Sequence, residues 1–486
     1  MLFNSYEFIF LFLPASFLIY FYLLNKRLIT GAKGFLVFSS LFFYSWWNIA
    51  YLPLILGSML FNYTIGNSLN NSHHNVKVSN KKLLAFGITA NLALLGYFKY
   101  ADFFIGNINL ATGSSYDLLH LALPLAISFF TFQQIAYLVD SYRGETHEYD
   151  FLNYALFVTF FPQLIAGPIV HHKEMMPQFA SRWNLVKNYR NIALGIFIFS
   201  MGLFKKVVIA DTFAQWATAG FDQAQTLNMI EAWATSLSYT FQLYFDFSGY
   251  TDMAIGAALL FNIKLPINFN SPYKALDIQD FWRRWHITLS RFLRDYIYIP
   301  LGGNRKSSLR TYSNLMVTFI LGGLWHGAGW TFVFWGFLHG TALVIHRFWK
   351  QLGFTLNPIL AWFITFNFIN IAWVFFRARE WEDALKVLYG MAGINGITLP
   401  EKFSDFLGVL SISFIKFGTV YEHIDGKTQT TVYILMGLII VLALKNSMYY
   451  LKNFRSSRLY LAATIAIFLT AVSMMSHVSE FLYFNF

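Results

Sequence analysis

Residues 311–346 read TYSNLMVTFILGGLWHGAGWTFVFWGFLHGTALVIH. This run contains no Asp, Glu, Lys or Arg, and it is long enough for two membrane-spanning helices, because one span needs about 20 mostly apolar residues. His326 lies near its middle, and four glycines surround it: Gly322, Gly323, Gly327 and Gly329. An ionisable side chain at membrane depth is costly and is by default a functional hypothesis. A helix broken by glycine at that depth is tolerated where it lines a cavity, and the alternative is a tight turn between two spans with His326 at the membrane interface.

Charge-free runs recur along the whole chain. The longer ones cover residues 8–25, 34–76, 118–139, 152–172, 357–376, 428–444 and 459–479, and shorter ones cover 83–98, 191–204 and 232–245. Only 12% of residues are charged and 56% are hydrophobic, whereas soluble domains carry about a quarter charged residues. The pattern predicts an all-α polytopic membrane protein with about eleven to thirteen spans. No small-residue cleavage pattern follows the first run, so we expect it to be retained.

The net charge of +11 is spread over short loops between spans. Basic clusters occur at 26–33, 77–82, 173–190, 283–310 and 445–458. This is typical of loops that face the cytoplasm, so we expect loop 26–33 inside and the N-terminus outside. No separate basic domain exists for nucleic acid, and the charge fits anionic lipid headgroups. The chain has no cysteine, which excludes disulfides, thiolate metal sites and an acyl-cysteine intermediate.

The segment 264–310 is polar and holds no full span. Its residues 264–306 read KLPINFNSPYKALDIQDFWRRWHITLSRFLRDYIYIPLGGNRK. Between Asp277 and Tyr298 the pattern predicts a helix with one shared face, formed by Trp282, Trp285, His286, Leu289, Leu293 and Tyr296. Such a charged helix lies at the cytoplasmic interface or lines a wet cavity. Its arginines suit a phosphate-rich donor or lipid headgroups, and they are Arg283, Arg284, Arg291 and Arg294.

Other polar residues are more ambiguous. His286 is either a second functional histidine or one satisfied by backbone or water. The segment LYFDFSGYTDMAIG at 243–256 contains Asp246, Tyr250 and Asp252. Its two acids could move protons, but we expect them to pair with the arginines of 283–294, because buried acids need partners. No third ligand stands at metal-binding spacing from either histidine, so no metal site is predicted.

An ordered set of motifs runs along nearly the whole chain. They are NLALLGYFKYADFF at 91–104, LPLAISFFTFQQIAYLVDSYRGE at 123–145, FFPQLIAGPIV at 160–170, GLFKKVVIAD at 202–211, the block from 238 to 305 that includes WRRWH, LGGLWHGAGWTFVFWG at 321–336 and AWVFFRA at 372–378. Together they resemble the membrane-bound O-acyltransferase family, on its bacterial alginate O-acetyltransferase branch.

The resemblance implies a fold and roles for residues. It implies one membrane domain over 1–486, a ring of tilted helices around a central funnel, with N-terminal helices at 1–140, a catalytic core at 150–350 and C-terminal helices at 351–486. The histidine of the WHG motif, here His326, is the implied catalytic base, and His286 is its polar partner. The expected donor or substrate contacts are the four arginines with Trp285, Trp325, Asp246 and Tyr250.

The resemblance also implies partners. The expected donor is acetyl-CoA, with no bound cofactor, and the acceptor is a cell-envelope or extracellular polysaccharide reached through an extracytoplasmic partner of the SGNH-hydrolase type. The location would be the bacterial cytoplasmic membrane, and a central tunnel would let donor and acceptor meet at His326. Two alternatives stay open: a D-alanyl transferase acting on teichoic acid with a carrier-protein donor, and a transporter or proton channel using Asp246, Asp252 and His326.

Overall fold

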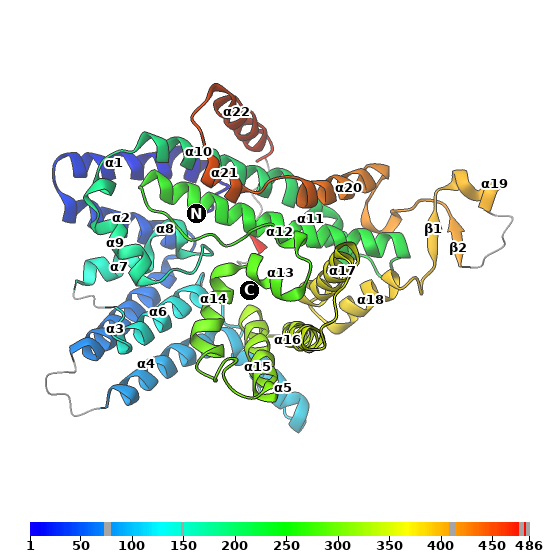
Figure 1. Ribbon diagram of the computed structural model, residues 1–486, viewed down its shortest axis with the longest axis horizontal. Helices are drawn as coiled ribbons and strands as arrows, with labels where there is room; N and C mark the ends of the chain where they lie inside the picture. The colour runs from blue at the N-terminus through cyan, green and yellow to red at the C-terminus, as the bar shows by residue number, and fades with distance from the viewer. Residues whose placement is uncertain (72–78, 147–149, 408–413, 476–480, 483–486) are drawn as a thin grey trace. The chain divides into compact units, whose positions relative to one another are not determined.

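The protein is almost entirely helical where the computed structural model describes it, at residues 1–71, 79–146, 150–407, 414–475 and 481–482 (Figure 1). Two three-residue strands, β1 Ile397–Leu399 and β2 Ile415–Phe417, pair in parallel with Ile397 opposite Ile415. The all-α class predicted from the charge-free runs is confirmed.

The chain forms two compact units. The first unit comprises Met1–Phe204, Gly249–Ile267 and Leu451–Phe486. Its helices are α1 Leu13–Asn25, α2 Ile29–Ser45, α3 Leu52–Asn71, α4 Asn80–Leu95, α5 Ala101–Thr112, α6 Ile127–Tyr142, α7 Phe151–Thr159, α8 Phe161–Leu164, α9 His172–Ala180, α10 Tyr189–Phe204 and α22 Arg458–Ser473.

The second unit comprises Lys205–Ser248 and Asn268–Tyr450. Its helices are α11 Asp211–Thr218, α13 Ile278–Arg284, α14 Ile287–Leu293, α15 Ser308–His326, α16 Trp330–Gln351, α17 Pro358–Arg377, α18 Trp381–Met391, α19 Ser404–Leu407 and α20 Thr428–Ala443. Two helices contribute residues to both units, α12 Met229–Leu260 and α21 Ser447–Asn453. Every residue of the candidate site described below belongs to the second unit, apart from Tyr250.

Five helical stretches in the described chain are long and apolar enough to cross a membrane, and a sixth results if the bent pair α20–α21 is one span. They are Glu7–Asn25, Ile49–Asn70, Asn80–Thr112, Tyr189–Gln223 and Pro358–Arg377. This supports a multi-pass membrane protein. The count is lower than the eleven to thirteen expected, because several charge-free runs are divided among short helices. Residues 152–172, for example, hold all but the first residue of the nine-residue α7, the four-residue α8, a loop and the first residue of α9.

The helix expected over 277–298 is interrupted at its middle. α13 ends at Arg284, Trp285 is extended, and His286 has a left-handed backbone with φ +43° before α14 begins. After α14 the chain continues as the π-helix η8 Arg294–Tyr298. The single shared face predicted for this segment is therefore wrong. The periodicity of residues 277–298 could not reveal the break. Asn268, whose side chain accepts hydrogen bonds from Thr288 just after the break, lies outside these residues.

α15 and α16 form a tight helical hairpin within the second unit (Figure 1). They pack closely at Gly323 and Gly336, where a Cβ added to Gly323 would lie 3.1 Å from the Cα of Gly336. Glycines at such crossings let two backbones pack against each other. The connection is only residues 327–329, so His326 is held at the end of the hairpin.

Candidate functional site

His326 is the last residue of α15 and is buried, with 3% of its surface exposed. Gly327 and Gly329 have extended backbones and join α15 to α16. The sequence left open a broken helix or a tight turn, and the geometry is a short turn whose histidine is buried in protein. Aromatic rings surround the imidazole, with centroids 4.9 Å away for Trp325, 5.3 Å for Trp335 and 5.0 Å for Phe376.

His286 lies beside His326, with ring centroids 6.4 Å apart. It is fully buried, and its Nδ1 lies 3.2 Å from Oδ1 of Asn268. That oxygen can only accept, so we assign the proton to Nδ1, which leaves Nε2 as the nitrogen that carries the lone pair. Burial lowers the pKa of His286 to about 3, since the charged ring would lose its hydration. The ring is therefore neutral at physiological pH.

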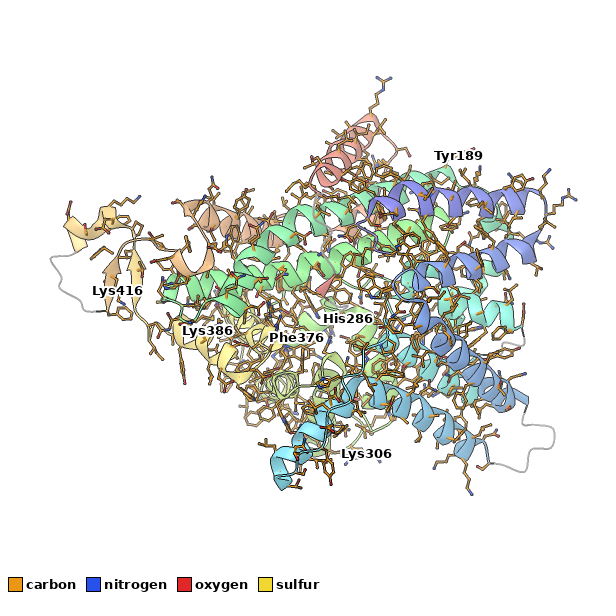
Figure 2. All side chains as sticks on the ribbon, turned by 180° about the vertical axis from the view of Figure 1, so that it is seen from behind. Tyr189, His286, Lys306, Phe376, Lys386 and Lys416 are labelled. Carbon is orange, nitrogen blue, oxygen red and sulfur yellow. The ribbon has the colours of Figure 1, made fainter. Side chains whose placement is uncertain are left out.

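The two histidines come from separate elements that converge in the second unit. His286 lies at the break between α13 and α14, and Phe247 of α12 packs edge-on against its ring at 4.7 Å. Phe376 of α17 packs against His326 with ring centroids 5.0 Å apart, and Figure 2 labels Phe376 and His286. Two imidazoles at this spacing can both contact one small polar group placed between them, which suits proton transfer at a hydroxyl.

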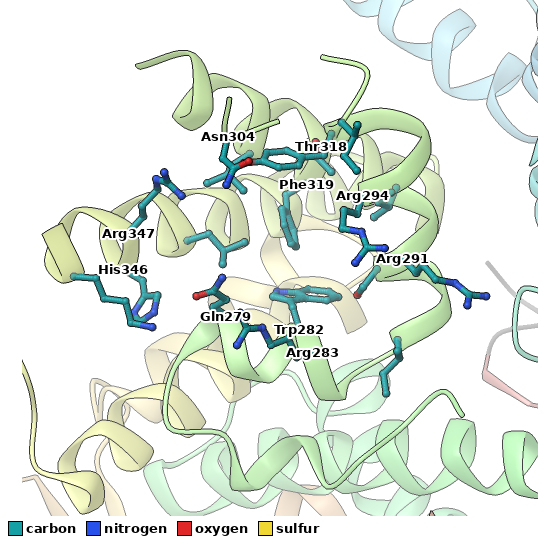
Figure 3. A pocket seen from close by; sticks show the side chains of 18 of the residues that line it. Gln279, Trp282, Arg283, Arg291, Arg294, Asn304, Thr318, Phe319, His346 and Arg347 are labelled. Carbon is teal, nitrogen blue, oxygen red and sulfur yellow. The ribbon is translucent and has the colours of Figure 1, made fainter. Parts of the chain in front are cut away.

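A cavity of about 880 Å³ opens next to this cluster, between α13, α14, η8, α15 and α16. Its charged lining residues are all basic or histidine: Arg283, Arg291, Arg294, His346, Arg347 and Lys350. Figure 3 shows Trp282 and Phe319 at its centre, with Arg294 and Arg347 around them. Asp295 pairs with Arg294 at 2.7 Å, and Asp277 lies 3.4 Å from His346 and 3.7 Å from Lys350. No acidic residue is part of the described lining, so the cavity favours an anionic ligand.

His326 does not line this cavity. Trp282 lines it and packs edge-on against Trp335 at 5.8 Å, and Trp335 in turn packs against His326. Two indole rings therefore separate the basic cavity from His326.

The predicted arginines divide into two groups. Arg283, Arg291 and Arg294 line the cavity together. Arg284 does not line it, because its Nε donates to Oδ2 of Asp280 at 2.9 Å, one helical turn earlier.

The predicted tryptophans also differ. Trp325 lies against both histidine rings, with centroids 4.9 Å from His326 and 6.3 Å from His286. Trp285 is buried in an aromatic core, 5.0 Å from Trp373. The packing of Trp285 therefore helps to hold the neighbouring residue His286 in position.

The two residues predicted from α12 have other surroundings. Asp246 is buried and forms an ion pair with Lys206 at 2.7 Å, a partner that the sequence did not suggest. Tyr250 belongs to the first unit, where its hydroxyl accepts from the backbone N–H of Ala166 at 3.3 Å and its ring packs on Phe3.

Several residues of the site were not found from the sequence. Arg347 and Lys350 end α16 and complete the basic lining, and their place after a long apolar run was an available signal. Trp335 of α16 and Phe376 of α17 are apolar residues, and nothing local distinguishes them from other core residues. In the part of the chain that the structure describes, no group of three or more His, Asp or Glu side chains lies close enough to hold a metal ion.

Comparison with known proteins supports the resemblance to the membrane-bound O-acyltransferase family. The sequence model of the membrane-bound O-acyltransferase family matches residues 10–378 of this chain. The chain is 52% identical to the peptidoglycan O-acetyltransferase of Helicobacter pylori, covering 100% of this chain and 98% of that protein. It is 43% identical to the probable alginate O-acetylase AlgI of Pseudomonas aeruginosa over 82% of this chain and 76% of the relative. It is 28% identical to the teichoic acid D-alanyltransferase of Streptococcus thermophilus over 52% of this chain and 68% of that protein. The chain belongs to the membrane-bound O-acyltransferase family and is an acyltransferase of the membrane.

Proposed function

We propose that this enzyme transfers an acetyl group from acetyl-CoA toward hydroxyls of a cell-envelope polysaccharide, with His326 as the general base. The observation that carries the proposal is the position of a buried histidine pair beside a large basic cavity. The pair supplies a proton acceptor, and the cavity supplies charge for a phosphate-rich donor. Both features are formed by adjoining helices of one unit.

The cavity supports coenzyme A as the donor. Arginine side chains bind phosphate oxygens through two N–H groups, and Arg283, Arg291 and Arg294 all line the same space. Asp277 and Asp295 neutralise part of the charge, yet the lining keeps an excess of positive groups. Alkyl and aromatic walls from Leu315, Phe319 and Leu343 suit the apolar arm of such a donor.

In the proposed reaction the acceptor oxygen attacks the carbonyl carbon of the thioester. His326 takes the proton from the hydroxyl as the new C–O bond forms, the C–S bond breaks, and the sulfur leaves with the proton returned by the imidazolium. General-base help of this kind contributes about 10²–10⁴-fold. A backbone N–H near Trp325 would stabilise the negative charge on the carbonyl oxygen, whereas Nε2 of neutral His286 can only accept a hydrogen bond from the acceptor hydroxyl.

We propose peptidoglycan as the final acceptor. The relative named peptidoglycan O-acetyltransferase matches this chain from end to end, whereas the AlgI relatives match 82% to 88% of it. An extracytoplasmic partner of the SGNH-hydrolase type would receive the acetyl group and pass it to the glycan, because the glycan lies outside the membrane. An alginate-like polymer is the alternative acceptor on the same chemistry.

The distribution of charge supports an orientation in the bacterial cytoplasmic membrane. α15 begins at Ser308, at the end of the basic stretch 283–310, and Arg347 and Lys350 lie in the last two turns of α16, so the hairpin would enter from the cytoplasm. His326, at its tip, would then be deep in the membrane. The N-terminus would face outward, with Lys26, Arg27 and Lys33 inside.

The direct test is donor turnover by the intact membrane protein. Purified wild-type protein in nanodiscs should release coenzyme A from acetyl-CoA when its partner and wall fragments are present. Cells lacking the chain should lose wall glycan species heavier by one acetyl group, and the returned gene should restore them. Retention of those species in the deletion strain would overturn the proposal.

A D-alanyl transferase is the second candidate, favoured by the 28% identity to the teichoic acid D-alanyltransferase. That enzyme class takes its donor from a carrier protein, so a basic cavity for free coenzyme A would have no role. Protection from thermal unfolding separates the two: acetyl-CoA protects under the first proposal, and only an aminoacyl-carrier protein protects under the second.

A further inference from the structure

His339 is a buried histidine of α16 for which the reaction above has no role. It lies one turn after Trp335, and the two rings are 4.7 Å apart. Both side chains are fully buried, with 0% and 1% of their surface exposed. Aromatic rings pack around His339 from three other helices, including Trp282 at 5.1 Å, Phe319 at 6.4 Å and Phe368 at 5.5 Å.

The polar contact of His339 is directed at the wall of the basic cavity. Nε1–H of Trp282 donates to Nδ1 of His339 at 3.2 Å. Nδ1 must then carry the lone pair, which fixes the neutral tautomer with its proton on Nε2. A buried indole N–H needs an acceptor, so this bond selects one orientation of the Trp282 ring.

That orientation matters because Trp282 is part of the barrier to His326. One side of Trp282 faces the cavity beside Phe319, with ring centroids 5.0 Å apart (Figure 3). The other side meets Trp335 at 5.8 Å, and Trp335 meets His326 at 5.3 Å. On the route from the cavity to His326 that these contacts define, a thioester passes the two rings, so their position sets the width of that passage.

We propose that His339 is a positioning residue that holds Trp282 in the wall between the basic cavity and His326, and that this contact restricts the transferred acyl group to a short one. The inference rests on the proposed function, since it takes the cavity as the donor's entrance. A freely turning indole would open space next to Trp335, and a longer acyl chain could then reach the histidine.

The experiment compares two substitutions of His339 in the full-length protein in nanodiscs. His339→Asn keeps an acceptor close to the position of Nδ1, and His339→Leu removes it at similar volume. The kcat/KM is measured with acetyl-CoA and with butyryl-CoA for each. An apolar pocket discriminates about 10–200-fold for a single methylene, so His339→Leu should raise the butyryl-to-acetyl ratio at least about tenfold. His339→Asn should keep the wild-type ratio.

Trp282→Phe provides an independent arm, because it removes the donor of the same hydrogen bond and keeps an aromatic ring. It should raise the ratio as His339→Leu does, and the double variant should show no further rise, since the two changes break one contact. An unchanged ratio in His339→Leu and Trp282→Phe, or equal ratios in His339→Leu and His339→Asn, would overturn the inference. If His339→Leu does not fold, the ratio in Trp282→Phe decides. A wild-type protein that turns over no acetyl-CoA would overturn the proposed donor, and this inference with it.

Discussion

At the scale of single residues, the histidine pair depends on one asparagine side chain. Oδ1 of Asn268 lies 3.2 Å from Nδ1 of His286 and accepts from the backbone N–H and the hydroxyl of Thr288 at 3.1 and 2.9 Å. The left-handed backbone of His286 costs on the order of 1–3 kcal/mol, and these bonds offset that strain. Asn268 therefore fixes both the break between α13 and α14 and the tautomer of His286.

The lowered pKa of His286 gives a prediction for stability against pH. The His286 ring lies outside the membrane-spanning helices and has a pKa of about 3 in the folded protein, against 6.5 for an ordinary histidine. As pH falls, the unfolded chain therefore binds a proton at this ring before the folded protein does. The folded protein therefore keeps its full stability with respect to His286 above pH 6.5, and it loses that stability progressively as the pH falls toward 3. The thermal unfolding temperature should fall between about pH 7 and about pH 4.5. His286→Asn, which tolerates the left-handed backbone, should show a smaller fall than the wild type.

The control for this measurement is His120→Asn. His120 is exposed and also has a left-handed backbone, with φ +46°. Its substitution should leave the dependence on pH as in the wild type. An equal fall in the unfolding temperature for His286→Asn and for the wild type would contradict the assignment of this dependence to His286.

At the scale of elements, the α15–α16 hairpin holds His326 through close backbone packing. A Cβ at Gly323 would overlap the carbonyl oxygen of Phe332, and one at Gly336 would lie 3.0 Å from the Cα of Ile320. Neither contact involves a flexible side chain that can move away. The two glycines therefore set the spacing of the hairpin and, through it, the position of His326.

Gly323→Ala should separate the two helices. Forcing a methyl group into a well-packed contact costs about 1–3 kcal/mol, so the unfolding temperature and acetyl transfer should both fall. Gly329→Ala is the matched control, since its Cβ would make only ordinary contacts at 3.6 and 3.8 Å. If both variants behave alike in a thermal unfolding and turnover assay, the packing explanation is wrong.

The buried ion pair of Asp246 with Lys206 joins the π-helix η5 Lys205–Ala210 to α12. Lys206 also contacts Asp211 at 2.9 Å, but Asp211 has 24% of its side chain exposed, against 2% for Asp246. Removing one partner of a buried pair costs about 3–5 kcal/mol, so Asp246→Asn should destabilise the protein strongly. Asp211→Asn should lower the stability less, because Asp211 is partly exposed and water can hydrate this side of Lys206 when the carboxylate is removed. Equal losses in thermal unfolding would contradict this ranking.

The elements show where sequence reasoning succeeded and where it failed. The length of the apolar run around His326 predicted two helices, which are α15 and α16, but it left open whether the glycines between them form a broken helix or a tight turn. The break at His286 was missed, since the residues 277–298 have continuous helical periodicity and the compensating asparagine lies upstream. Asp246 was expected to pair with the abundant arginines of 283–294, and the structure gives it an ion pair with Lys206, which is far from that segment in the sequence.

At the scale of the whole molecule, the distribution of charge predicted the membrane class and an orientation. The site could be predicted only in part: the two histidines and three arginines were found, whereas Trp282, Trp335 and Phe376 contribute through packing. Packing partners of apolar residues depend on which helices meet, and one sequence does not contain that information. The resemblance to a family supplied the pairing of His286 with His326, which spacing alone had left open.

The orientation gives a prediction that the absence of native cysteine makes simple to test. Single cysteines are introduced at Lys306, before α15, and at Lys416, in β2, both of which are exposed (Figure 2). In intact spheroplasts a membrane-impermeant maleimide should label Lys416→Cys. Lys306→Cys should be labelled only after the membrane is opened. Labelling in the reverse order would invert the orientation and place the basic cavity outside.

The most direct test of the central claim is the acetyl transfer activity of His326→Asn in membranes that contain the partner. We expect a loss of about 10²–10⁴-fold relative to the wild type, with normal membrane insertion, while His120→Asn keeps full activity. Wild-type transfer by His326→Asn would contradict a role for this histidine as the general base.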